Sequence, residues 1–174
     1  MTRSIVLIAG SPAAESRSSF VLDAFGQALT ARGFTSERYS LTSFALEDLI
    51  RARAESETVA RFLKSVEGAR GVVFSTPVYK ATYAGVLKLI IDLLKPEALD
   101  GKVALAITTA RLEPHLAEVD ESFQRLYRFF RGSVGLRSLG LLDPQLGASG
   151  ALKLHQSAQR AFEEALDRLS AAAS

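Results

Sequence analysis

Residues 4–19 read SIVLIAGSPAAESRSS, a short apolar run followed by a glycine and a loop that holds four serines and one arginine. Residues 4–9 are rich in β-branched side chains and show no alternation of apolar and polar residues, which is typical of a strand buried on both faces. From residue 19 to residue 32 apolar side chains recur at helical spacing, and Gly33 allows the left-handed turn that ends a helix. The stretch therefore predicts a buried strand that leads through a polar loop into a helix.

The same alternation of short apolar runs and longer helical patterns continues along the chain. Further strands are expected at residues 36–40, 71–75, 102–109 and 136–142, and helices at residues 19–32, 56–68, 85–94, 116–131 and 151–169. Apolar strands without alternation indicate a parallel sheet that helices cover on both faces. Because crossovers between parallel strands are right-handed, we expect a flavodoxin-like, doubly wound α/β fold whose five-stranded parallel sheet has the order 2-1-3-4-5.

Length and composition fit one globular domain that spans residues 1–174. The content of 48% hydrophobic and 23% charged residues excludes the disordered class. The absence of cysteine excludes disulfides, thiolate nucleophiles and zinc–thiolate sites, and it fits a reducing compartment. The 21 basic and 19 acidic side chains leave a net charge of +2 without a dense basic stripe, so no nucleic-acid partner is expected.

No segment has the pattern of a membrane span or a signal peptide. The most apolar stretch, residues 83–94, is broken by Lys88 and Asp92 and is shorter than the roughly 20 residues that a bilayer requires. The apolar run at residues 5–9 is shorter than the apolar region of a signal sequence. We therefore expect a cytoplasmic protein with no membrane partner.

The loop after the first strand has the residue types of an anion site. It matches neither the dinucleotide fingerprint GxGxxG nor the P-loop GxxxxGK[ST]. It does bring serine hydroxyls and Arg17 to the start of a helix, where free backbone N–H groups and the helix dipole attract a phosphate. The alternative is that Ser16 or Ser18 merely caps the helix. Its position after the first strand of a doubly wound sheet, where ligands bind, favours the anion site.

The loop after the third strand, residues 76–85, reads TPVYKATYAG. A proline and two tyrosines at the carboxyl end of a strand form a stiff, amphipathic wall that can lie along an aromatic ring. The alternative is a rigid connector. The helix expected at residues 85–94 is apolar almost all round, which is unusual for an exposed helix and predicts a homo-oligomer formed through it.

On these two loops the chain resembles the NADPH-dependent FMN reductase family, most closely the branch that supplies reduced flavin to alkanesulfonate monooxygenases. The segments that carry the resemblance are residues 9–12, 16–19, 76–85, 87–88, 92–94, 101–103, 115–116 and 119–120. The resemblance implies hydride transfer from NADPH, or from NADH, to FMN. It also implies a homodimer or homotetramer and a partner monooxygenase.

The resemblance also implies which residues bind FMN, in three groups. The phosphate is expected to contact Ser11, Ser16, Arg17, Ser18 and Ser19; the isoalloxazine is expected to contact Thr76, Pro77, Val78, Tyr79 and Lys80; and its pyrimidine side is expected to contact Thr109, Ala110 and Arg111.

Three positions depart from the family pattern. Ala13 stands where many members have arginine, and Glu121 stands where the sulfonate branch often inserts a tyrosine linked to transfer of reduced flavin. Ala110 and Arg111 stand where that branch tends to have two glycines. Three roles remain open for Arg111: stabilising reduced flavin, binding the 2′-phosphate of NADPH, or lying in solvent.

We assign no catalytic side chain and no metal ligand, because the flavin carries the chemistry of hydride transfer. His115 and His155 are expected to be structural, and the carboxylates at positions 113, 118, 120 and 121 to form a solvated helix face. The alternatives are an FMN-dependent quinone or chromate reductase, a flavodoxin-type electron carrier and a regulatory flavin module. Such carriers are usually strongly acidic, and this chain is not.

Overall fold

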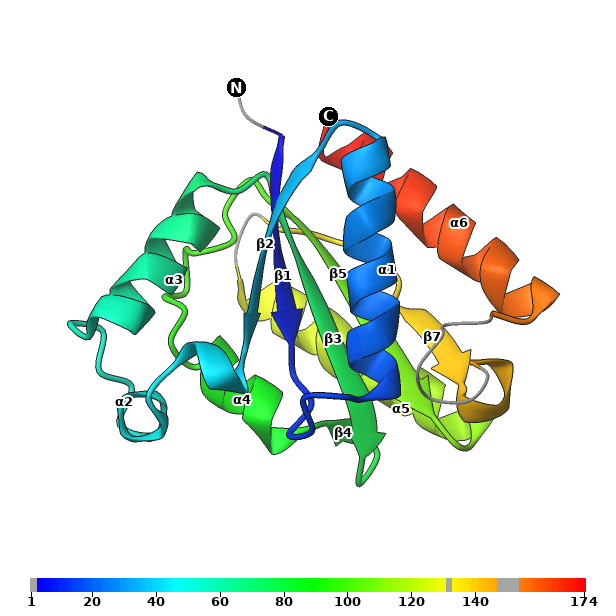
Figure 1. The fold of residues 1–174 in the computed structure, drawn as a ribbon, viewed down its shortest axis with the longest axis horizontal. Helices are drawn as coiled ribbons and strands as arrows, with labels where there is room; N and C mark the ends of the chain where they lie inside the picture. The colour runs from blue at the N-terminus through cyan, green and yellow to red at the C-terminus, as the bar shows by residue number, and fades with distance from the viewer. Residues whose placement is uncertain (1–2, 131–132, 147–153) are drawn as a thin grey trace.

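The computed structural model describes residues 3–130, 133–146 and 154–174. Its centre is a parallel sheet of β1 (Ser4–Ala9), β2 (Thr35–Ser40), β3 (Gly71–Tyr79), β5 (Val103–Ala110), β6 (Val134–Gly135) and β7 (Leu139–Leu142) (Figure 1). The strand order is β2-β1-β3-β5-β6, and β7 also pairs with β5. Since β6 and β7 together occupy the fifth position, the flavodoxin-like order 2-1-3-4-5 is confirmed, with the last strand divided in two.

Helices cover both faces of the sheet (Figure 1). One face packs against α1 (Arg17–Ala31) and α6 (Gln156–Ala172), and the other against α2 (Leu46–Ile50), α3 (Glu57–Gly68), α4 (Gly85–Ile91) and α5 (Glu113–Phe129). Alternate residues of β1 enter the two cores, Ile5 and Leu7 on one face and Val6 and Ile8 on the other. This two-sided burial is why the strand sequences do not alternate. In the part of the chain that the structure describes, no helix is both long and apolar enough to cross a membrane.

Several element boundaries differ from those expected. The helices expected to begin at residues 19 and 116 begin at Arg17 and Glu113. The short turn η1 (Leu41–Ser43) and α2 were not expected, because both are too brief to show a periodic pattern. The last helix begins at Gln156 and ends at Ala172. Residue 131, expected to end the preceding helix, and residues 151–153, expected to begin the last one, lie outside the described residues.

The largest correction concerns the segment after the third strand. Residues 76–79, expected as a loop, continue β3. Thr76 and Pro77 still pair with β5, whereas Val78 and Tyr79 pair in antiparallel fashion with β4 (Thr82–Tyr83). Lys80 and Ala81 form the two-residue turn of this hairpin, with φ angles of +52° and +64°. Turns of this hand favour asparagine and glycine, neither of which is present, so the sequence carried no hairpin signal.

The apolar side chains of α4 pack mainly inside this chain. Leu87 and Ile90 are fully buried, and Ile91, Leu93 and Leu94 are buried as well. The helix ends at Ile91, earlier than expected, and faces the core beneath β3 and α5 rather than solvent. The premise that this helix is apolar on an exposed face was therefore wrong, because its apolar residues complete a core within the chain.

Asp120 of α5 is buried and anchors the divided edge of the sheet, whereas we expected it on a solvated helix face. Its carboxylate accepts hydrogen bonds from the Ser138 backbone N–H at 2.9 Å and from Arg137 Nη1 at 2.9 Å. Gln124 reaches the same carboxylate at 3.4 Å and also donates to the Leu136 carbonyl at 3.1 Å. Burial raises the pKa of Asp120, but these hydrogen bonds together outweigh it, and the pKa lies below its ordinary value.

Asp120 should therefore contribute stability that is present at neutral pH and lost as the pH falls through its lowered pKa. We expect Asp120→Asn to lower the free energy of unfolding by about 1 kcal/mol at pH 7, the difference between charged and neutral hydrogen bonds. In urea titrations the deficit should be nearly the same at pH 5 as at pH 7 and should shrink at pH 3.5 and below, because the contribution is lost only below the ordinary pKa of aspartate. Asp92→Asn, in an exposed pair with Lys88, is the control and should change little at any pH. If the loss of unfolding free energy in Asp120→Asn were the same at every pH, the charge of Asp120 would not contribute, and its role would be packing only.

Candidate functional site

A cleft of about 890 Å³ opens where β1, β3 and β5 end. Most of the residues expected to bind FMN line it: Ser11, Ser16, Arg17, Ser18, Pro77, Val78, Tyr79, Lys80, Thr109, Ala110 and Arg111. Three segments far apart in the sequence therefore converge on one site. They do so because the carboxyl ends of neighbouring parallel strands share one edge of the sheet.

The serine loop leads into the first turn of α1, and the alternative that a serine caps the helix holds for Ser16. Ser16 is the N-cap: its hydroxyl accepts from the Ser19 backbone N–H at 3.1 Å and donates to Ser19 Oγ at 2.9 Å. Ser18 Oγ lies 3.1 Å from Ser16 Oγ, and both residues also line the cleft. Ser19 is buried and does not line the cleft; it lines a separate small hollow next to Arg38.

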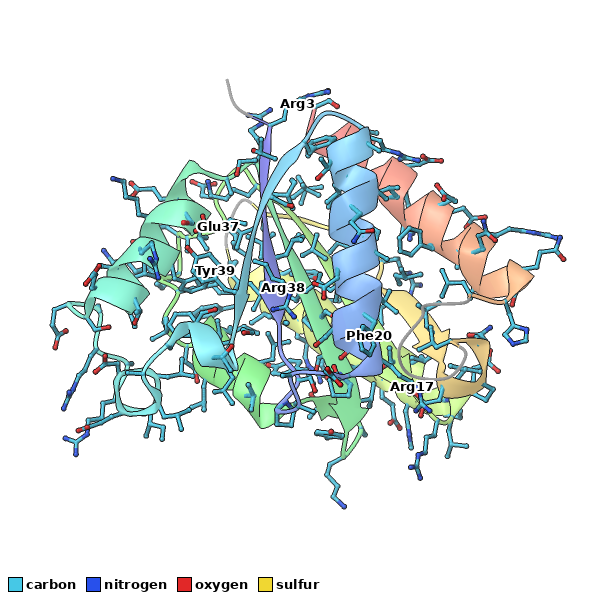
Figure 2. All side chains as sticks on the ribbon, viewed as in Figure 1. Arg3, Arg17, Phe20, Glu37, Arg38 and Tyr39 are labelled. Carbon is cyan, nitrogen blue, oxygen red and sulfur yellow. The ribbon has the colours of Figure 1, made fainter. Side chains whose placement is uncertain are left out.

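Arg17 leaves the start of α1 on the side where β7 ends (Figure 2). Its Nη1 lies 3.0 Å from Oδ2 of Asp143, and its side chain is 47% exposed. Arg111, whose side chain is 90% exposed, lies 4.0 Å from the same oxygen. The cleft thus has two guanidinium groups at one end, with a single carboxylate between them.

The β3–β4 hairpin forms the second wall. Pro77 and Val78 are half-buried, and Tyr79 and Lys80 are exposed at the tip. Thr76 does not line the cleft, contrary to expectation: it is fully buried, donates to the Pro77 carbonyl at 2.8 Å and accepts from Ala84 N–H at 3.0 Å. It therefore braces the hairpin from inside.

The turn of this hairpin stores backbone strain. A residue other than glycine in the left-handed region costs roughly 1–2 kcal/mol, and Lys80 and Ala81 both adopt it. Such strain persists only where the surrounding structure enforces it, and it gathers at ligand sites. The strain fits a hairpin shaped to present its face to a ligand.

The end of β5 and the start of α5 form the third wall. Thr109 and Ala110 are nearly buried and expose only small surfaces to the cleft. His115, which we expected to be structural, lines the cleft from the first turn of α5. Sequence reasoning also missed Ala13, Ala81, Leu112 and Asp143. Of these, Asp143 carried a usable signal, since it directly follows the last strand at the same edge of the sheet.

Comparison with known proteins assigns the family. The sequence matches the NADPH-dependent FMN reductase family over residues 3–141. The chain belongs to this family. It is 35% identical to the FMN reductase (NADPH) of Pseudomonas putida over 162 residues, which cover 93% of this chain and 82% of the relative. It is 40% identical to the FMN reductase (NADPH) of Escherichia coli over 116 residues, which cover 67% of this chain and 61% of the relative.

The solved structures agree on the fold. The apo form of an NADH:FMN oxidoreductase, EMOB, aligns with a TM-score of 0.91 over 99% of this chain and 91% of that one, at 24% identity. The expected resemblance is confirmed, and with it the enzyme class, an NAD(P)H:FMN oxidoreductase, and the cofactors FMN and NADPH or NADH. Among the described residues, no group of three or more histidine or acidic side chains could hold a metal ion.

Proposed function

We propose that this member of the FMN reductase family binds FMN in the described cleft, with the phosphate at the start of α1 and the ring along the β3–β4 hairpin. The observation that carries the proposal is the convergence of the serine loop, the hairpin and the end of β5 on one space of about 890 Å³. Ligand sites of this size are typical for cofactors, since pockets of roughly 300–1,000 Å³ accommodate them.

The phosphate end fits the residues present. The N–H groups of the first helical turn lack intrahelical acceptors and point toward an approaching anion. Ser11, Ser16 and Ser18 add hydroxyl donors, and Arg17 supplies the positive charge. In the free protein Ser19 Oγ accepts the hydrogen bond of the Ser16 hydroxyl, so Ser16 is proposed to turn from Ser19 to the phosphate when FMN binds.

The ring end also fits. Pro77, Val78 and Tyr79 offer a stiff apolar surface against which a flat ring can lie, and Lys80 adds a charge at its edge. Thr109 and Ala110 close the far side with small side chains that leave room for the ring. A bound FMN would supply the hydride-accepting chemistry, so the residues of this chain bind and orient and none needs to exchange a proton.

The proposal is tested by following NADPH oxidation with and without added FMN, and then measuring the flavin that stays with the protein after gel filtration. Oxidation that depends on added FMN, with little flavin retained, supports a reductase that releases its flavin. Retained FMN without turnover would favour the flavodoxin-type carrier. Repeating the assay with NADH gives the preference between the two nicotinamide cofactors.

We further propose that the reduced flavin serves a partner monooxygenase, as the resemblance to the sulfonate branch implies. The alternative is direct reduction of a quinone or chromate in the same cleft. A comparison of acceptors separates the two: supply to a monooxygenase predicts an NADPH oxidation rate that follows the concentration of free FMN and does not change when quinone or chromate is added. Direct reduction predicts a rate that rises and saturates with the concentration of quinone or chromate at fixed FMN.

We also propose a homodimer or homotetramer that uses the surface around α2 and α4. Ile50 and Leu46 of α2 are 68% and 58% exposed, and Val86 and Leu89 of the neighbouring α4 are half-buried. Light scattering at micromolar concentration should show at least a dimer. Ile50→Glu should dissociate it without unfolding, because Ile50 contributes little to the core and a charge in an interface is costly. A monomeric wild-type protein would refute this proposal.

A further inference from the structure

The carboxylate of Asp143 faces the arginine that is proposed to hold the flavin phosphate. Asp143 Oδ2 lies 3.0 Å from Arg17 Nη1 and 4.0 Å from Arg111 Nε. Asp143 begins a short turn that follows β7, and the Gln145 side chain fixes this turn by accepting from the Leu142 N–H at 2.7 Å. Hydrogen bonds thus fix the backbone that carries the Asp143 carboxylate at the cleft. The carboxylate already pairs with Arg17, the cation that is proposed to bind the phosphate.

This ion pair can be exchanged for another. Its partners are 47% and 22% exposed, and pairs that water reaches contribute little free energy. A phosphate dianion brings a larger charge and several acceptor oxygens to the same guanidinium. If Asp143 stays beside the bound phosphate, the two like charges repel each other; if it moves away, its own pair with Arg17 is lost. Either way the carboxylate works against the bound phosphate.

We propose that Asp143 competes with the flavin phosphate for Arg17 and thereby keeps FMN exchangeable, an inference that rests on the proposed function. In the free protein the carboxylate neutralises Arg17. When FMN binds, its phosphate takes the place of the Asp143 carboxylate beside Arg17. The dissociation constant of FMN is therefore higher than it would be if the serine loop and Arg17 bound the phosphate without this competition. Riboflavin, which has no phosphate, does not compete with Asp143.

The test measures the dissociation constants of FMN and riboflavin by quenching of flavin fluorescence on Asp143→Asn and Asp143→Ala. Both variants should bind FMN about twofold to fivefold more tightly, the range expected when a partly exposed ion pair is removed, with riboflavin unchanged. Unchanged riboflavin binding also shows that the cleft has kept its shape. Asp23→Asn is the matched control, since Asp23 pairs with Arg38 at 2.7 Å outside the cleft, and it should leave FMN binding unaltered.

Weaker FMN binding in the Asp143 variants would overturn the proposal, because it would mean that the carboxylate positions Arg17. Unchanged binding, or equal tightening of riboflavin, would overturn it too. In an Arg17→Ala background the gain from Asp143→Asn should disappear, and a gain of full size there would exclude competition for Arg17. A wild-type chain that does not bind FMN refutes the proposed function itself, whereas FMN binding that depends on Arg17 but not on Asp143 refutes only this inference.

Discussion

Replacing Arg17 with alanine is expected to weaken FMN binding by about 1.5–3 kcal/mol, a roughly 10- to 150-fold rise in the dissociation constant. The reason is the loss of a charge-assisted hydrogen bond to the phosphate at the start of α1. Riboflavin should bind the variant and the wild type equally well. The comparison is made by fluorescence titration of both flavins on both proteins.

Arg38→Ala is the matched control for this prediction. Arg38 also carries a guanidinium paired to an aspartate, Asp23, but it lies on β2 away from the cleft (Figure 2). It lines a separate small hollow on the other side of the serine loop, together with Ser40 and Thr42. If the Arg38 variant lost FMN binding and the Arg17 variant kept it, the phosphate site would have to be that hollow and not the start of α1.

Gly10→Ala is expected to destabilise the protein by about 2–3 kcal/mol, at the upper end of the range for overpacked cores. Gly10 is buried where β1 ends, and a Cβ there would overlap Cβ of Leu87, a fully buried residue of α4. Leu87 cannot turn away, because Cβ is fixed to the helix backbone, so α4 itself must move. Thermal unfolding should show a melting temperature lower by about 4–12 °C.

Gly68→Ala is the control for Gly10→Ala. Gly68 ends α3, and a Cβ added there meets no atom within 4 Å. This change should leave the melting temperature unaltered or raise it slightly, because alanine favours the helix. If both variants melt alike, the close approach of Gly10 to Leu87 does not exist in solution.

The sequence predicted the sheet well because its three central strands, β1, β3 and β5, carry the pattern of two-sided burial. The first strand has the expected bounds, residues 4–9, and the strand order follows from right-handed crossovers. The third strand was cut short at residue 75 because Pro77 is normally a breaker. In the structure Pro77 still pairs with Thr109 near the end of the strand, where the sheet tolerates a missing donor.

The site was predicted in part for a similar reason. Serine and arginine at the start of a helix carry a local chemical signal, so Ser16, Ser18 and Arg17 could be found from the sequence. Thr76 and Ser19 are of the right residue type, but Thr76 is fully buried and Ser19 lines the hollow beside Arg38 instead of the cleft. Orientation is set by packing that no motif encodes. Asp143 belongs to no motif and enters the cleft only because β7 pairs with the end of β5.

The most direct test of this account is a crystal structure of the chain with FMN bound. The phosphate should lie at the first turn of α1, within hydrogen-bond distance of the Arg17 guanidinium and the hydroxyls of Ser16 and Ser18. The isoalloxazine should lie against Pro77 and Tyr79 of the β3–β4 hairpin. A phosphate found instead in the hollow beside Arg38, or a ring that does not touch the hairpin, would contradict the account.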